Sequence, residues 1–171
     1  MALPAKLKNF NIFNAGNNWR GLAESITLPK LTRKLEKYRG GGMNGAAPID
    51  LGLDDDALSL EFTMGGMHKL PFEQWGDPVI DKTMLRFVGA YEEDDTGDVM
   101  SVEVVVRGRH KEIDSGEAKQ GDNTQVKVSM ECTYYKLTID NETVIEIDVV
   151  NFVENVGGND RLDKYRNILG L

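Results

Sequence analysis

The stretch TQVKVSMECTYYKLTI, residues 124–139, alternates in polarity along most of its length. One set of alternating positions is mainly apolar: Val126, Val128, Met130, Cys132 and Tyr134. The other set is mainly polar: Lys127, Ser129, Glu131, Thr133 and Tyr135. A period of two is typical of a β-strand with one buried and one exposed face. We therefore predict a half-buried strand, in which Cys132 is a small buried hydrophobe rather than a reactive thiol.

The neighbouring segments carry the same signal. Residues 83–92 and 98–113 each have the pattern of a strand, and an acidic turn at 93–97 joins them. The turn sequence Asp-Asn at 140–141 predicts a further strand at 144–153, paired with the strand before it. The central part of the chain is thus predicted to be antiparallel β-structure.

The sequence of the N-terminal region predicts a hairpin. Two other segments each predict a helix. FNIF, residues 10–13, and WRGLAESITL, residues 19–28, flank a loop rich in Asn and Gly and are expected to pair. A short helix is expected within residues 68–78, where Gly76 and Pro78 end it. The tail predicts another helix, with Asn159 or Asp160 as N-cap and Gly170 after its last turn.

Residues 28–39, LPKLTRKLEKYR, fit two structures. Leucines and a tyrosine recur at helical spacing at positions 28, 31, 35 and 38. Polarity also alternates from residue 31 onwards, as it does in a strand. Periodicity alone leaves both the helix and the strand open.

The glycine-rich segment that follows matches the consensus sequence of a dinucleotide-binding motif. Gly40, Gly42 and Gly45 stand in the order GxGxxG. A phosphate-binding loop must open a helix, whose N-terminal N–H groups hold the anion, but Pro48 would interrupt a helix that began at Gly45. The acidic run at 54–56 would also repel a phosphate. We therefore interpret this segment as a loop without a nucleotide.

Composition and motifs argue against several classes of function. Among 171 residues, 20 are basic and 28 acidic, so the net charge of −8 disfavours a nucleic-acid-binding surface. A single cysteine excludes an intrachain disulfide, and we expect neither a signal peptide nor a membrane anchor. The Asp95-Thr96-Gly97 triplet lies among other acids and predicts a solvated turn, not a protease site. His68 and His110 lack metal-ligand spacing, so no cofactor, metal or catalytic residue is predicted.

Five segments of the sequence are distinctive: LPKLTRKLE, YRGGGMNG, DLGLDDDALS, RGRHKEID and YYKL. Through them nearly the whole chain resembles the major tail tube protein of contractile-tailed phages, and residues 67–82 are the least similar part. The tube protein of R-type bacteriocins is similar too. The resemblance implies a mainly β fold of two packed antiparallel sheets, a β-sandwich or barrel-like tail tube fold, with one short flanking helix. It also implies that residues 29–39 are extended rather than helical.

The resemblance further implies a structural, non-enzymatic role. A single tail-tube domain, residues 1–171, would form hexameric rings that stack into a hollow tube inside a sheath, with residues 40–58 as an extended inter-subunit loop. Implied partners are other copies of the chain, the tail sheath protein, the tape measure protein and the baseplate hub or spike initiator. DNA would pass through without specific binding, helped by negative charge in the lumen. The expected location is the virion tail, after assembly in the host bacterial cytoplasm.

Two sets of residues are candidates for these contacts. The predicted interface between subunits or rings consists of Tyr38, Arg39, Gly40, Gly41, Gly42, Met43, Asn44, Gly45, Asp54, Asp55 and Asp56. The predicted lumen-facing residues are Lys127, Ser129, Glu131 and Thr133. We expect residues 40–56 to be mobile in the free subunit and ordered between subunits. A bacteriocin tube and, more remotely, a ligand-binding β-sandwich remain alternatives.

Overall fold

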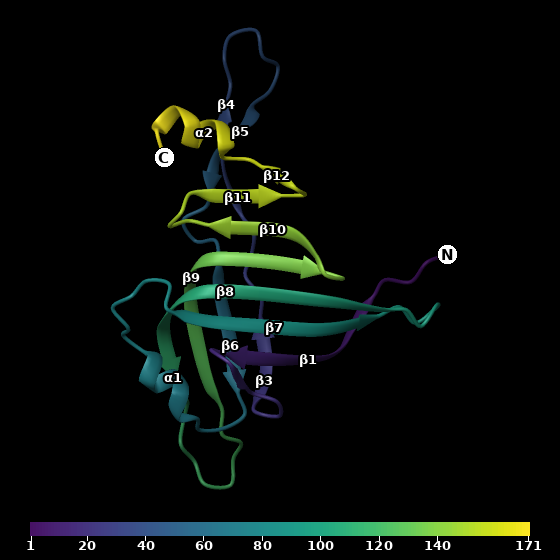
Figure 1. Cartoon of the computed structure of the whole chain (residues 1–171), viewed down its shortest axis with the longest axis vertical. Helices are drawn as coiled ribbons and strands as arrows, with labels where there is room; N and C mark the ends of the chain where they lie inside the picture. Colours follow the sequence, from purple (N-terminus) through teal and green to yellow (C-terminus); the bar gives the residue numbers. More distant parts are fainter.

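The computed structural model describes all residues from Met1 to Leu171 and consists mainly of antiparallel strands, with a narrow arm that projects from the body (Figure 1). The strands are β1 (Lys6–Asn14), β2 (Asn17–Asn18), β3 (Ala23–Thr27), β4 (Arg33–Tyr38), β5 (Ala47–Leu53), β6 (Ser59–Met64), β7 (Thr83–Glu92), β8 (Val99–Asp114), β9 (Val126–Ile139), β10 (Glu142–Asp148), β11 (Val153–Val156) and β12 (Asn159–Asp160). The helices are α1 (Lys69–Gln74) and α2 (Asp163–Leu169).

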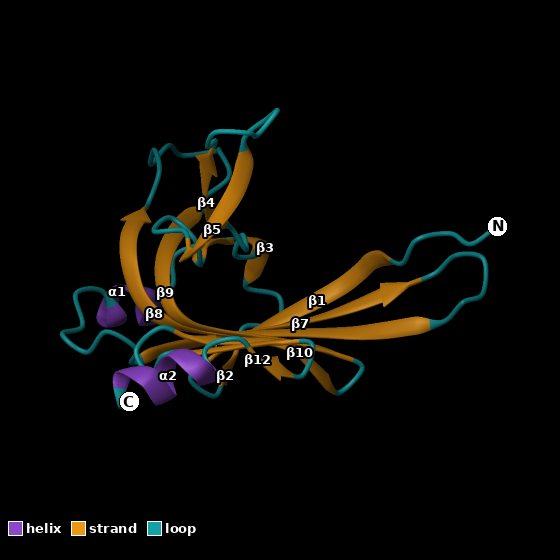
Figure 2. Ribbon diagram, turned by 90° about the horizontal axis from the view of Figure 1, so that it is seen from above, coloured by secondary structure: helices purple, strands orange, loops and turns teal.

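The body is built around two long strands, β8 and β9. The main path of the sheet runs β12-β11-β10-β9-β8-β7-β1-β2, while β6 pairs with β9 and β3 pairs with β6. The first part of β9, residues 126–131, pairs with β6, and residues 134–139 pair with β10. Both long strands curve strongly, so that one layer rises away from the other (Figure 2). Packed antiparallel layers are therefore confirmed, but the two layers are continuous through β8 and β9.

A bulge at Thr133 and a glycine opposite it mark the bend. Arg107 pairs with Tyr134, whereas the next residue, Gly108, pairs with Cys132, so that Thr133 is the extra residue. A Cβ atom on Gly108 would lie 2.0 Å from the carbonyl oxygen of Glu131, a distance that no side chain permits. Bulges increase local twist and bend the strand that carries them. Only glycine allows the close approach seen here.

The bulge also corrects the predicted alternation in β9. Val126, Val128 and Met130 are buried as predicted, and Cys132 is half-buried. After the extra residue the faces exchange, so that Tyr135, and not Tyr134, enters the core. An inserted residue reverses the faces because the side-chain period of a strand is two.

The core lies between the two layers. Trp19 and Phe62 are 2% and 1% exposed, with ring centroids 5.6 Å apart. Fully burying side chains of this kind contributes about 1.5–3 kcal/mol each. The buried hydrophobic residues are Ile12, Trp19, Ala57, Leu58, Leu60, Phe62, Met64, Leu85, Phe87, Val102, Val104, Val106, Val126, Val128, Met130, Tyr135 and Ile147.

The N-terminal hairpin prediction is wrong beyond its turn. β1 pairs along its length with β7 and meets only the two-residue β2. Trp19 follows β2 and its side chain enters the core, while its backbone N–H donates to the carbonyl of Ile12 at 2.9 Å. The chain then crosses to the other layer, where β3 pairs with β6. Burial of the Trp19 indole therefore ends the hairpin.

Two other predicted boundaries also change. The strand predicted at 144–153 begins at Glu142 and ends at Asp148, and a turn with Phe152 at φ 56° leads into β11. The tail helix exists, so there are two short helices rather than one flanking helix. Neither Asn159 nor Asp160 is its N-cap, because both belong to β12. Gly170 ends α2 with φ 73°, as predicted.

The predicted helix within 68–78 is confirmed as α1, and a buried polar cluster fixes it to the body. Asn14 Nδ2 donates to Gln74 Oε1 at 2.8 Å, and Gln74 Nε2 donates back to Asn14 Oδ1 at 2.7 Å. His110 Nε2 lies 2.9 Å from the same Gln74 Oε1. Burial lowers the pKa of His110 to about 4, so this imidazole is neutral at neutral pH and donates one N–H.

Candidate functional site

The most distinctive surface element is the arm formed by β4 and β5. These strands pair only with each other, from Arg33 opposite Leu53 to Tyr38 opposite Ala47. Every residue of β4 is exposed, so the arm has no core of its own. The extended conformation implied for residues 29–39 is thus found at 33–38, and the helical alternative is wrong.

The segment predicted as a long loop, 40–58, is only partly a loop. Residues 47–53 form β5, and the irregular part of the arm is its tip, residues 39–46. Pro48 is tolerated because a two-stranded ribbon leaves one edge of each strand free. Gly45 leads into a strand rather than a helix, so the GxGxxG spelling lacks the context of a phosphate site.

The predicted interface residues fall at opposite ends of the arm. Arg39 to Gly45 lie in the tip and Tyr38 ends the strand before it; in the tip, Gly42 has φ 81° and the Met43 N–H donates to the Gly40 carbonyl at 3.3 Å. Asp54, Asp55 and Asp56 lie at the base, in a turn closed by Ala57 N–H to Asp54 O at 3.1 Å. The structure therefore does not bring the acids to the glycine-rich tip.

The arm also exposes large apolar side chains that the predicted interface mostly omitted. Leu31, Leu35, Tyr38, Ile49 and Leu51 are 45–59% exposed. Only Tyr38 was among the predicted contacts. Leucines and a tyrosine recur in 28–39, but no period-two alternation of apolar residues marks this exposed ribbon. Leu35 and Tyr38 are three positions apart in one strand and therefore point to opposite faces of the ribbon. Nothing in the single chain covers these side chains, as is typical of a surface that contacts a partner.

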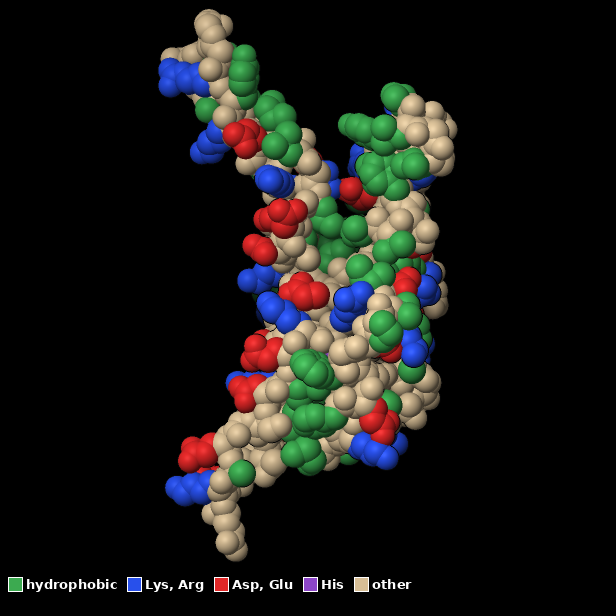
Figure 3. All heavy atoms as spheres, turned by 90° about the vertical axis from the view of Figure 1, so that its left-hand side faces the viewer, with side chains coloured by type: hydrophobic (Ala, Val, Ile, Leu, Met, Phe, Trp, Pro, Cys, Tyr) green, Lys and Arg blue, Asp and Glu red, His purple; other side chains and the backbone are tan.

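A cleft of about 730 Å³ separates the base of the arm from the C-terminal elements (Figure 3). Its walls include Leu51 and Leu53 from the arm and Phe152, Leu162 and Tyr165 from the opposite side. Hydrophobic side chains gather on both sides of this hollow, on the arm and at the C-terminal end (Figure 3). The apolar C-terminal surface consists of Tyr165, Ile168, Leu169 and Leu171, all more than half exposed.

Arg33 connects the arm to the body. Its guanidinium lies 2.9 Å from Asp50 Oδ2 on β5 and also pairs with Glu154 on β11. The hydrogen bond and charge of Asp50 raise the pKa of Arg33, and Arg33 in turn lowers the pKa of Asp50. A backbone bond from Asp54 N–H to Thr32 O at 2.9 Å closes the base of the arm. These contacts set the direction in which the arm leaves the body.

The predicted lumen-facing residues do not all behave alike. Lys127 and Glu131 are exposed, and Ser129 half-exposed, on the outer side of the layer that contains β6. Glu131 Oε2 accepts a hydrogen bond from Ser59 Oγ at 2.8 Å. Thr133 sits at the bulge, and its hydroxyl oxygen is buried without a partner. Thr133 is therefore not part of the same exposed row.

The structure contains no group of three or more His, Cys, Asp or Glu side chains placed to hold a metal ion. No helix has both the length and the apolar character needed to cross a membrane.

A mainly antiparallel β fold with an apolar arm and a second apolar surface defines a protein that assembles with other chains. The fold is similar to that of a chain in the 6-fold symmetrised cryo-EM structure of the anti-feeding prophage (AFP) baseplate. The TM-score is 0.50 and the identity 13%, over 81% of this chain and 97% of that chain. At this identity the likeness concerns the fold alone.

Sequence comparison identifies the family. Residues 4–170 match the phage tail tube protein FII family, and the chain belongs to it. It is 54% identical to the tail tube protein of Escherichia phage P2 over 172 residues, covering 100% of both chains. It is 46% identical to the major tail tube protein of Serratia phage KSP20, covering 100% of this chain and 99% of that one. The chain is therefore a structural subunit of the tail tube of a contractile-tailed phage, located in the virion tail.

Proposed function

We propose that copies of this chain form hexameric rings, and that the rings stack into a hollow tube inside the tail sheath. The observation that carries the proposal is the arm, which projects from the body with exposed apolar side chains that nothing in the chain covers. The fold is also shared with a chain of a 6-fold symmetrised assembly. Contacts between different patches on successive copies close rings or extend filaments, depending on the rotation between copies.

Within this tube, the tip of the arm and the acids at its base contact neighbouring subunits or rings. The tape measure protein and, later, DNA occupy the lumen, the sheath surrounds the tube, and a baseplate hub or spike starts assembly. The chain has 28 acidic and only 20 basic residues. This excess of negative charge supports passage of DNA without binding, because negative side chains repel the phosphates. The phage origin of both relatives favours a DNA-conducting tube over a headless bacteriocin particle. Capsid and terminase genes beside this one would confirm that choice.

Polymerisation is the direct test. We expect monomers or single rings at low concentration and long tubes at high concentration or on addition of a hub complex. Analytical ultracentrifugation over a wide concentration range, with negative-stain microscopy of the same samples, measures this. Stable monomers throughout, even with the hub, would contradict the proposal and favour a ligand-binding β-sandwich.

Thiol labelling tests whether β9 lines the lumen. Burial, with a smaller effect of the Glu131 charge, raises the pKa of Cys132 to about 12, so native protein should react slowly with a maleimide. Glu131→Cys in a Cys132→Ser background should react readily in free subunits because residue 131 is exposed. In assembled tubes, a large maleimide conjugate should no longer reach it.

One control and two contrary outcomes complete the labelling experiment. Unfolded native protein should label fast at Cys132, which shows that burial causes the protection. Undiminished labelling of residue 131 by the large conjugate in long tubes would instead place this strand on the outside, against the sheath. Fast labelling of folded native protein would show that the Cys132 side chain is more accessible than its half-buried position indicates.

A further inference from the structure

The arm has the opposite charge to the rest of the protein. Residues 30–53 contain five basic and two acidic side chains, which leaves 15 basic and 26 acidic side chains elsewhere. The arm thus carries a net charge of +3 on a body of −11. Its basic side chains that form no ion pair are Lys30, Lys34, Lys37 and Arg39; Arg33 is already paired. An exposed basic and apolar arm calls for an acidic and apolar receptor.

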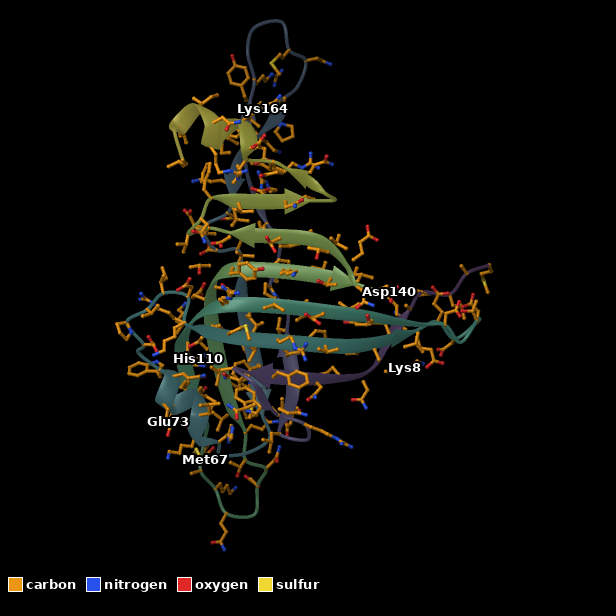
Figure 4. The ribbon with its side chains drawn as sticks, viewed as in Figure 1. Lys8, Met67, Glu73, His110, Asp140 and Lys164 are labelled. Atoms are coloured by element: carbon orange, nitrogen blue, oxygen red, sulfur yellow. The ribbon has the colours of Figure 1, made fainter.

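The end of the molecule opposite the arm carries a further apolar surface, distinct from the C-terminal one. It belongs to the α1 segment, residues 67–82. Its exposed apolar side chains are Met67, Phe72, Trp75, Val79 and Ile80, each 40–69% exposed. Met67 and Glu73 lie towards the end of the molecule away from the arm, whereas Lys164 lies beside the arm (Figure 4). The two apolar surfaces are therefore far apart on one chain.

This end is also acidic. The α1 segment and the neighbouring residues 111–124 together carry seven acidic and four basic side chains. Several of these are paired internally, as in Lys69 with Glu73 at 3.1 Å and Lys82 with Asp77 at 3.1 Å. The acids without an ion pair are Asp81, Glu112, Asp114 and Glu117. Net charges of +3 on the arm and −3 here are complementary.

We propose that the acidic, apolar end formed by residues 67–82 and 111–124 is the receptor for the arm of a second copy. This rests on the proposed function, since it names the surface that the arm meets when rings stack. Different patches at opposite ends form a head-to-tail contact, which propagates instead of stopping at a dimer. The apolar side chains supply the buried area, and the charges orient the approach of the arm. The cleft at the base of the arm is excluded as the receptor because it opens at the same end as the arm.

Charge reversal tests the proposal. In the double variant Lys34→Glu, Lys37→Glu, and in the double variant Glu112→Lys, Glu117→Lys, we expect the concentration needed for tube formation to rise about tenfold or more. The four side chains are exposed and form no ion pair within the chain, so we expect all three variants to fold. The quadruple variant combines all four substitutions, so it keeps the native net charge but reverses the charges at both ends. Its concentration for tube formation should lie within about threefold of that of the native protein.

Two single substitutions of exposed valines by aspartate test the apolar part of the same contact. Val79→Asp should raise the polymerisation concentration at least about tenfold, because an uncompensated charge would be buried in the contact. Val99→Asp is the matched control, since Val99 is also exposed but lies outside both surfaces, and should polymerise normally. Circular dichroism checks that both variants remain folded.

The outcomes separate this inference from the proposed function. If native protein forms tubes and the arm variant does not, but the Glu112→Lys, Glu117→Lys and Val79→Asp variants polymerise normally, the arm meets another receptor and the inference is wrong. Failure of the quadruple variant to recover would equally overturn it, as would equal loss in Val99→Asp. If native protein with a hub forms no tube, the proposed function itself fails.

Discussion

Replacing residues 34–52 with an Asn-Gly turn is expected to leave a folded subunit that no longer forms tubes. Arg33 and Leu53 are cross-strand partners at the base of the arm, so two residues can join them in a tight hairpin. None of the removed residues is buried. The free energy of unfolding should therefore change by less than about 1 kcal/mol, as for surface changes in general. Thermal unfolding measures the first effect, and sedimentation with electron microscopy the second.

The extent of the deletion matters. Removing residues 41–55 would leave β4 without its partner and would break the bond from Asp54 N–H to Thr32 O. Replacing residues 34–52 instead keeps that bond and the pairing of Arg33 with Glu154. Loss of the cooperative unfolding transition in this variant would mean that the arm stabilises the subunit itself. Normal tubes would mean that stacking does not depend on the arm.

The regular strands were predictable because one of their faces is buried in the same chain. β7 was predicted from Thr83 to Glu92 and is found there, and β8 differs by one residue at each end. The prediction failed at Thr133, where one extra residue reverses the faces of β9. No local pattern marks that residue, since the bulge depends on the partner strand and on Gly108 opposite.

The arm shows a different limit of prediction from sequence. β4 carries only two apolar side chains, Leu35 and Tyr38, and their spacing of three residues places them on opposite faces of the ribbon. Both are more than half exposed in the single subunit, so no face buried within the chain imposes a strand period on this sequence. The resemblance to tail tube proteins, and not the periodicity, decided between strand and helix.

The anchoring of α1 carried no sequence signal at all. Asn14 and Gln74 are 60 positions apart, and Gln74 and His110 are 36 apart, yet they share one buried cluster. Asn14 was expected in a loop and His110 had no assigned role. Such contacts follow from tertiary packing, which brings distant polar groups together, although His110 Nδ1 stays buried without a hydrogen-bond partner.

The second large effect is expected at the bend, where Gly108→Ala should lower the free energy of unfolding by about 3 kcal/mol or more. The added methyl group would overlap the Glu131 carbonyl oxygen at 2.0 Å and the Cys132 Cα at 2.7 Å. Both are backbone atoms in a paired strand, so no side-chain rotation can relieve the overlap. For a chain of this size the midpoint of thermal unfolding should fall by about 6–12 °C. Gly45→Ala is the matched control, because no atom lies within 4 Å of its added Cβ.

The bend also links stability to assembly. Gly108 and Thr133 lie where β9 passes from β6 to β10, so they fix how one layer is placed over the other. Separating β8 from β9 there would shift the end that carries α1 relative to the arm, because α1 is anchored to β8 through His110. Any Gly108→Ala protein that remains folded is therefore expected to form tubes poorly, whereas Gly45→Ala should keep the native thermal midpoint. If Gly108→Ala unfolds at the native temperature, the bulge absorbs the methyl group and the bend does not depend on this close approach.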